Sequence, residues 1–322
     1  MTHTRFGSLH TFVVSVLLAA AAQAADEGQT PTQTDDGRVR TEFTQVDATT
    51  LTGKVMCGYQ GWFNCDGDGA NLGWTHWARN RRRPFAPGNV TVDLWPDVSE
   101  LDTDQRYATG FVHADGQPAE VFSSGDRKTV MQHFRWMQQY GIDGAFLQRF
   151  AVGLQRTDTL RHKNNVLAHV REASRESGRA YAVMYDLSGL RSGEVSRLRD
   201  DWRMLQQLKI TGDASYLHHK GGPVVAVWGI GFSDGRKYSL RECLDLVSWL
   251  KSEGCTVMLG VPSFWREGRR DAVDDPLLLE TLQQADVISP WTVGRYRTPE
   301  EATRHAAAVW QPDRLWCARY EI

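Results

Sequence analysis

The chain has 322 residues, of which 41% are hydrophobic, and a formal net charge of −2 at pH 7. This near-neutral balance lacks the strong basic excess of proteins whose main partner is nucleic acid, so we expect no such partner. Five cysteines without a CxxC motif do not require a disulfide framework, although Cys57 with Cys65 and Cys243 with Cys255 are candidate pairs.

The first residues have the pattern of a secretory signal peptide. An apolar run at residues 12–22 follows a basic start, and Ala22-Gln23-Ala24 is a small-x-small cleavage site. The run is shorter than the about 18 apolar residues that indicate a membrane span. We therefore expect residues 1–24 to be removed on export, residues 25–50 to form a disordered lead-in, and residues 51–322 to form one folded domain. The mature protein is predicted to be secreted or periplasmic and free of the membrane.

The segment "VMCGYQGWFNCDGDGANLGWTHW" begins as an apolar strand and continues as a loop rich in aromatic residues and glycine. Asn64, Asp66 and Asp68 are spaced like the first ligands of a calcium-binding loop. Thr75 stands where that loop needs a bidentate glutamate, so we expect no metal here. Arg79 and Arg81 to Arg83 follow, and the prolines after them favour a solvated loop over an anion site.

Short apolar runs, typical of parallel strands covered on both faces, alternate with amphipathic segments along the rest of the chain. The expected strands are Lys54–Trp62, Ile142–Phe150, Ala180–Asp186, Pro223–Gly229, Thr256–Pro262 and Asp286–Trp291. The expected helices are Asp126–Tyr140, Asp158–Ser177, Gly193–Leu208, Ser239–Glu253, Asp275–Ala285 and Pro299–Trp310.

This alternation, without a dinucleotide-binding glycine motif, predicts an α/β fold of the (β/α)8 TIM-barrel type. Only six strand–helix units are apparent where a closed barrel needs eight, so the barrel is expected to be incomplete. Val90–Leu94 is a candidate for a further strand, but the chain ends at "RLWCARYEI" with no expected helix after it.

Aromatic and polar residues follow most of the expected strands, where the functional sites of such barrels lie. This combination suits a sugar, whose C–H faces stack on aromatic rings while its hydroxyls bond to amide, guanidinium and carboxylate groups. Asp186 is the candidate catalytic carboxylate, with capping of the following turn as the alternative. The candidate substrate-binding residues are Tyr59, Gln60, Trp62, Trp77, Asp93, Trp95, Gln148, Arg149, Trp228, Trp265 and Trp291.

Several motifs, taken together and in order, resemble the glycoside hydrolase 71/99-like group, which is related to endo-α-mannosidases and α-1,3-glucanases. They are "GKVMCGYQGWFNCDGDG", "VDLWPDVSE", "YGIDGAFLQRF", "AYAVMYDLSG", "YLHHKGGPVVAVWGIGF" and "ISPWTVGRY". The resemblance implies a barrel that acts on α-linked polysaccharides or oligosaccharides without a metal or organic cofactor. It also implies that Tyr59 and Trp62 line the sugar site and that Asp186 is the acidic group after the third strand.

The sequence departs from this group near its end. Motifs resembling "PGFSW" and "DEIDEGTA", which would supply the two carboxylates of glycosidic cleavage, are not found before Ile322. We therefore expect a truncated or naturally short barrel whose open strand edges favour self-association. Three hypotheses follow: a glycosidase using Asp93, Asp186 or Glu267, a non-catalytic glycan-binding protein, and a calcium-stabilised structural domain.

Overall fold

The computed structural model describes residues 45–322, so the predicted signal peptide and most of the predicted lead-in lie outside the described residues. The described chain forms two compact units. We call residues 62–129 the inserted unit, and residues 45–61 together with 130–322 the barrel unit. No helix within residues 45–322 is both long and apolar enough to cross a membrane.

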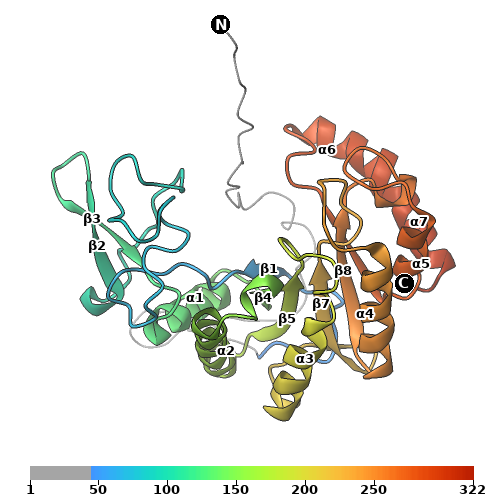
Figure 1. The fold of residues 1–322 in the computed structure, drawn as a ribbon, viewed down its shortest axis with the longest axis horizontal. Coiled ribbons are helices and arrows are strands. Elements are labelled where there is room, and N and C mark those ends of the chain that lie inside the picture. The colour runs from blue at the N-terminus through green and yellow to red at the C-terminus, as the bar shows by residue number, and fades with distance from the viewer. Residues whose placement is uncertain (1–44) are drawn as a thin grey trace, which may run out of the picture. The chain divides into compact units, whose positions relative to one another are not determined.

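The barrel unit is built on six parallel strands (Figure 1). These six strands lie in the sheet in the same order as in the chain. A further short strand, β6 (His218–His219), pairs antiparallel with β7 and is not part of this series. The path begins at β1 and ends at β9, so the strands form a half-barrel, which confirms the predicted incomplete α/β barrel. The parallel strands are β1 (Met56–Tyr59), β4 (Gly144–Phe150), β5 (Ala180–Asp186), β7 (Gly222–Trp228), β8 (Thr256–Pro262) and β9 (Val287–Trp291).

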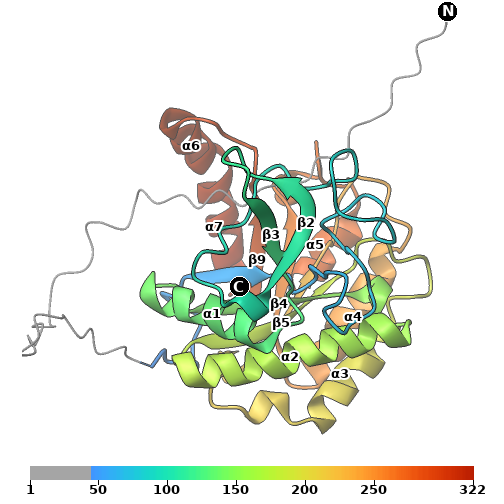
Figure 2. The ribbon, with the colours of Figure 1, turned by 90° about the vertical axis from the view of Figure 1, so that its left-hand side faces the viewer.

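Helices connect the strands and cover the outer face of the sheet, with α2 lying beside α3 (Figure 2). Their ends carry the expected signals: Gly178 adopts a left-handed conformation after α2, and Ser239 forms a capping box with Glu242 at the start of α4. The helices are α1 (Arg127–Gln139), α2 (Thr157–Ser177), α3 (Arg197–Gln207), α4 (Leu240–Ser252), α5 (Pro276–Leu282), α6 (Pro299–His305) and α7 (Gln311–Arg319), with a π-helical turn at Ala306–Trp310.

The central strands of the barrel unit are covered on both faces, as their apolar sequences predict. All seven residues of β8 are buried, as are six of the seven in β5 and five of the seven in β7. Trp202 and Leu205 of α3 are fully buried against this sheet. The edge strand β9 is only half-buried, because it has a paired strand on one side alone within the described residues.

The inserted unit contains one antiparallel hairpin, β2 (Arg106–Val112) with β3 (Pro118–Phe122), and a small aromatic core. The prediction of a strand at Val90–Leu94 is wrong, because this segment is irregular. Its backbone is held elsewhere: Thr91 N donates to Trp77 O at 2.9 Å.

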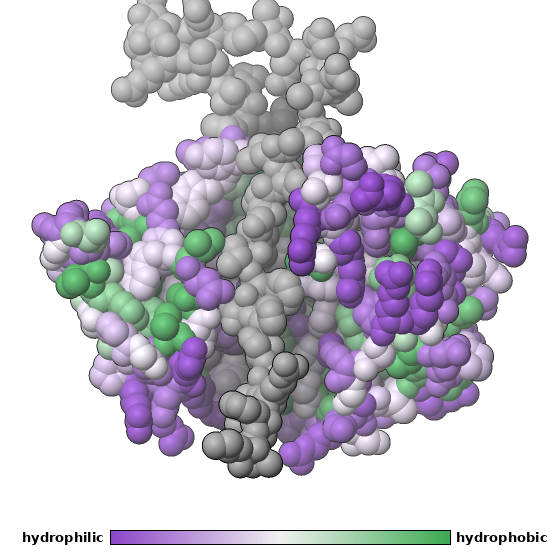
Figure 3. Space-filling model, turned by 90° about the horizontal axis from the view of Figure 1, so that it is seen from above, coloured by the Kyte–Doolittle hydropathy of each residue, from purple (hydrophilic) through white to green (hydrophobic). Residues whose placement is uncertain are grey.

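On the face seen in Figure 3, hydrophobic residues appear in separated patches among hydrophilic ones.

The final segment forms α7, where Pro312 stands in the first turn and Arg319 in the last. One further expectation needs correction. The candidate disulfides are not formed, since all five cysteines are free.

Candidate functional site

The carboxyl ends of β4, β5 and β7 bring three polar and aromatic side chains onto one face of the sheet. Residues directly paired between parallel strands share a face, and so do residues two apart along a strand. Asp186 pairs with Trp228, and Gln148 pairs with Met184, two residues before Asp186. Gln148, Asp186 and Trp228 therefore point to the same face, and Gln148 Nε2 donates to Asp186 Oδ2 at 2.9 Å.

Asp186 is only 3% exposed. Its Oδ1 accepts a hydrogen bond of 2.7 Å from Ser188 N, so the carboxylate both caps the turn after β5 and bonds to Gln148. Burial raises the pKa of Asp186 above its usual range, and the bonds from Ser188 and the nearby Arg236 oppose that shift only in part. A carboxyl group of this kind can hold a proton at a pH where an exposed aspartate is ionised.

Residues of β7, β8 and β9 together position the aromatic side chains of the site. The indole of Trp228 lies over Gly260 of the neighbouring strand β8, where a Cβ atom would stand 2.3 Å from Trp228 Cδ1. Glycine is thus the residue that leaves room for the ring. Trp291, at the end of β9, meets Trp228 edge to face with 5.7 Å between ring centroids. Trp291 is 38% exposed and so offers a ring to a ligand.

The loop after β7 adds a cation to these rings. The Arg236 guanidinium lies 5.3 Å from the ring centroids of both Trp228 and Phe232, within the range of cation–π attraction. Its Nη1 donates to Ser188 Oγ at 2.8 Å, which links this loop to the turn that Asp186 caps. Residues of the same loop, with Leu240 and Val273, line a cavity of about 270 Å³.

Arg149 does not belong to this group, although it follows Gln148 directly. It pairs with Tyr185 on the opposite face of the sheet and is 1% exposed. Its Nε and Nη2 donate to the Asp201 carboxylate of α3 at 3.0 and 2.6 Å, and Tyr185 Oη donates to the same carboxylate at 2.7 Å. Nη2 also bonds to Asn164 of α2. Arg149 therefore joins the sheet to its covering helices, and this geometry corrects its predicted place in a sugar site.

The other predicted site residues of the barrel unit are Tyr59, Gln60 and Trp265. Tyr59 is buried, and its Oη bonds to His133 Nδ1 of α1 at 2.8 Å. Gln60 is exposed just after β1. Trp265 is 1% exposed and packs against Trp316, so it is a core residue rather than part of an accessible wall.

In the inserted unit, two of the predicted tryptophans are structural. Trp77 is 2% exposed and its Nε1 donates to Phe122 O. Trp95 stacks on Phe85 at 5.6 Å, and its Nε1 donates to Glu120 O at 2.9 Å.

The remaining two candidates of the inserted unit are less enclosed. Trp62 is half-buried and stacks on His76 with 4.1 Å between centroids. Asp93 is exposed in the irregular segment before Trp95.

The calcium-like loop of the inserted unit is held by protein donors. The Asp68 carboxylate accepts hydrogen bonds from Asn64 Nδ2, Cys65 N, Ala70 N and Ser123 Oγ at 2.8 to 3.0 Å. These bonds fold the turn and occupy the oxygens that a cation would need. Within residues 45–322, no group of three or more His, Cys, Asp or Glu side chains is arranged to hold a metal ion.

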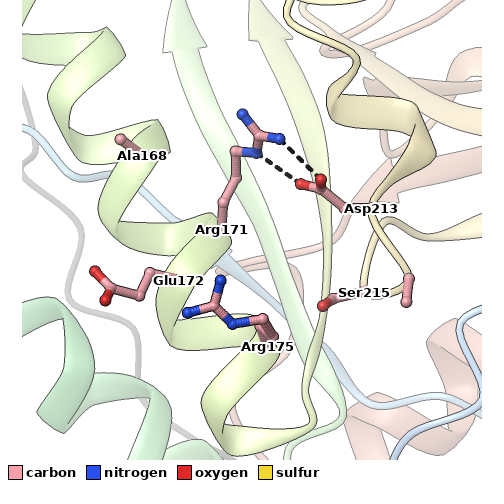
Figure 4. A pocket seen from close by; sticks show the side chains of 7 residues that line it. Ala168, Arg171, Glu172, Arg175, Asp213 and Ser215 are labelled. Carbon is pink, nitrogen blue, oxygen red and sulfur yellow. Dashed lines mark hydrogen bonds and ion pairs between the residues drawn. The ribbon is translucent and has the colours of Figure 1, made fainter.

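A polar pocket at the other end of the strands is formed by α2 and residues 213–215 (Figure 4). Its main feature is a two-bond ion pair from Arg171 to Asp213, with distances of 2.6 and 2.8 Å. Ser215 O accepts a bond from Tyr181 N near the start of β5, which places this pocket at the amino ends of the strands. Functional sites of α/β barrels lie at the opposite ends of the strands, so this pocket is not where the fold predicts the functional site.

Sequence reasoning missed Ser188, Phe232 and Arg236. The signal for the last two was present in "GIGFSDGRKY", a glycine-rich loop after an apolar strand with an aromatic residue and an arginine.

Comparison with known proteins supports one class of fold. No protein-family model matches this sequence, and no curated protein matches it. Among solved structures, the fold is similar to that of a glycoside hydrolase barrel. One such structure is the GH99 endo-α-mannosidase from Bacteroides thetaiotaomicron in complex with bis-tris propane, with a TM-score of 0.54 and 11% identity over 86% of this chain and 68% of that chain.

A second structure of the GH99 endo-α-mannosidase from Bacteroides thetaiotaomicron has a TM-score of 0.50 and 14% identity over 86% of this chain and 70% of that chain. At these identities the likeness concerns the fold. It confirms, at that level, the resemblance inferred from the sequence motifs.

Proposed function

We propose that this protein binds α-linked glycans at the carboxyl ends of the strands of the barrel unit. The observation that carries the proposal is the shared face of Gln148, Asp186 and Trp228, with the exposed ring of Trp291 at 5.7 Å from Trp228. The fold likeness to an endo-α-mannosidase supports the choice of an α-linked ligand.

The chemistry of the group suits a sugar. The rings of Trp228 and Trp291 offer apolar faces to the C–H groups of a pyranose, while carboxyl and amide groups accept and donate hydrogen bonds to its hydroxyls. Asp186 and Gln148 already bond to each other, so their orientation is set before a ligand arrives. Preorganised polar groups lose less entropy on binding.

Hydrolysis is a second candidate, favoured by one observation: burial raises the pKa of Asp186, as a proton donor to a leaving oxygen requires. Cleavage ordinarily needs a second carboxylate, as nucleophile or base. Glu267, one candidate for that role, is held in ion pairs by Arg266 and Arg269. Binding is therefore the function better supported by the geometry.

The test is a titration of tryptophan fluorescence with α-1,3-glucan and α-mannan oligosaccharides. We expect a saturable change that is lost in Trp228→Ala and Trp291→Ala. The matched control is Trp249→Phe, which alters a half-buried tryptophan of α4 that lies under Arg199 and Arg203 of α3. Equal responses of all three variants would contradict the proposed site.

Release of reducing sugar from the same glycans separates the two candidates. If it occurs and disappears in Asp186→Asn, the protein is a hydrolase that uses this carboxyl group. Binding without release leaves the glycan-binding function.

We also propose export to the periplasm or medium, which rests on the signal-peptide pattern of residues 1–24. N-terminal sequencing of the protein recovered outside the cytoplasm should start at Ala25.

A further inference from the structure

The inserted unit carries four arginines in one short segment, which we call the arginine loop (residues 79–83). Arg79, Arg82 and Arg83 are exposed, and Arg81 is half-buried. The next aromatic residue, Phe85, is fully buried in the aromatic core of the unit. The arginine loop is thus a short surface segment attached to a packed core.

The backbone of the arginine loop is held from inside by one side chain, that of Asn89. Its Oδ1 accepts from Asn80 N at 2.8 Å, and its Nδ2 donates to Asn80 O at 3.1 Å and to Pro84 O at 2.9 Å. The Asn80 side chain in turn accepts from Arg82 N at 3.1 Å. The loop therefore presents its arginines from a fixed backbone.

A second anchor holds the middle of the loop. Trp74 N donates to Arg81 O at 2.9 Å. This approach depends on Gly73, whose φ is +62° and where a Cβ atom would stand 2.3 Å from Arg81 O. A side chain at position 73 would clash with that carbonyl and strain the backbone.

The charges of the arginine loop are not balanced by neighbouring acids. Among the described residues, none of its four guanidinium groups lies within ion-pair distance of a carboxylate. Other cations of the same unit are paired: Arg106 with Glu120 at 3.6 Å and Lys128 with Asp104 at 2.7 Å. Within residues 45–322, the one hydrogen bond from a guanidinium of the loop is from Arg79 Nε to Val90 O at 3.1 Å. Arg82 and Arg83 thus keep their donors available.

We propose that the arginine loop binds an anionic polysaccharide through its sulfate or carboxylate groups. Guanidinium groups bind such oxoanions with two parallel hydrogen bonds, and a ligand of repeating negative charge would pair with cations that have no acidic partner among the described residues. The arginine loop shares no residue with the proposed site on β4, β5 and β7, and the inference does not depend on that site.

A membrane or a nucleic acid fits this surface less well. No large hydrophobic residue within residues 79–89 is exposed, so the loop lacks the apolar groups that insert into a lipid surface. The net charge of the chain is −2, and a basic region of five residues is short compared with the phosphate-binding surfaces of nucleic-acid-binding proteins. Both remain as comparison ligands in the test.

The test uses the full chain and measures affinity for heparin, which carries sulfates, and for polygalacturonate, which carries carboxylates. Neutral dextran, a duplex DNA and vesicles containing phosphatidylserine serve as comparisons. We expect binding to at least one anionic polysaccharide that is tighter than to the other three. The double variant Arg82→Gln/Arg83→Gln should weaken it at least about ten-fold and make the affinity less dependent on salt concentration, since fewer counterions are released on binding.

The matched control is Arg197→Gln/Arg203→Gln on α3. It changes the net charge by the same amount, but both arginines are exposed and paired with acids, Glu194 and Asp200. Equal losses in the two double variants would show that net charge alone governs binding and would overturn the proposal. Tighter binding of DNA or vesicles than of either polysaccharide would also overturn it.

Discussion

The buried ion pair between Arg149 and Asp201 joins the carboxyl end of β4 to α3, and its contribution to stability can be tested quantitatively. The change is Asp201→Asn, which keeps the shape of the side chain and removes its charge. The side chain of Arg149 is 1% exposed and that of Asp201 is 5% exposed, so solvent cannot compensate the guanidinium left behind. Removing one partner of such a buried pair costs about 3 to 5 kcal/mol.

This cost can be converted into a melting temperature. Unfolding about 280 residues at about 2.1 cal/mol/K each gives an entropy of about 0.6 kcal/mol/K, so the expected decrease in Tm is about 5 to 9 °C. Tyr185, which donates to the same carboxylate, loses a charged acceptor and adds to the effect. Differential scanning calorimetry measures the shift directly.

The adjacent acid provides the control. Asp200→Asn removes a carboxylate whose side chain is 81% exposed and which lies 3.4 Å from Arg203, so its Tm should stay close to that of the unmodified protein. The double variant Arg149→Met/Asp201→Leu, in which no charge is left buried, should recover most of the loss. If Asp201→Asn and Asp200→Asn melt within about 2 °C of each other, the pair does not have the role inferred from its burial.

Three further outcomes are expected. Gly260→Ala should weaken glycan binding at least about ten-fold with the chain still folded, because the new Cβ displaces Trp228; unchanged fluorescence titration would contradict this. Burial lowers the pKa of His133 to about 4, so its contribution to stability is present above about pH 6.5 and is lost as the pH falls toward 4. Urea unfolding at several pH values should show this loss, and His133→Gln should remove it; an unchanged pH profile in the variant would be inconsistent with a buried neutral imidazole. Finally, β9 has no partner strand on its outer side among the described residues, and Leu315 of α7 is exposed. Together they predict a mass that rises with concentration in light scattering and less so in Leu315→Glu, whereas a monomer at all concentrations would exclude self-association.

The strands of the barrel unit could be predicted from the sequence because each is a nearly continuous apolar run. Ala180–Asp186 and Thr256–Pro262 were placed at their observed limits for this reason. The hairpin of the inserted unit was missed, although Asp115-Gly116 between two β-rich segments is a hairpin signal. The irregular Val90–Leu94 resembles a strand locally, and only its contacts with the rest of the inserted unit decide otherwise.

The candidate site was predictable in part. Gln148, Asp186 and Trp228 meet because parallel strands end at one edge. Arg149 could have been separated from Gln148, since neighbouring residues of a strand point to opposite faces. Whether a tryptophan lies in a core or on a surface depends on tertiary packing, which the local sequence does not encode: Trp77 and Trp291 were both predicted to bind the substrate, yet one is 2% exposed and the other 38%.

The position of Trp291 on β9 links ligand binding to the local opening of one strand. Within the described residues, β9 is paired on one side only, and edge segments open with lower free energy than the strands between them. A ligand that stacks on Trp291 can bind only while β9 is docked beside β8, so its binding energy also closes that strand. Amide hydrogen exchange of residues 287–291 should therefore slow on addition of the glycan, while exchange in β5, already buried, should change little.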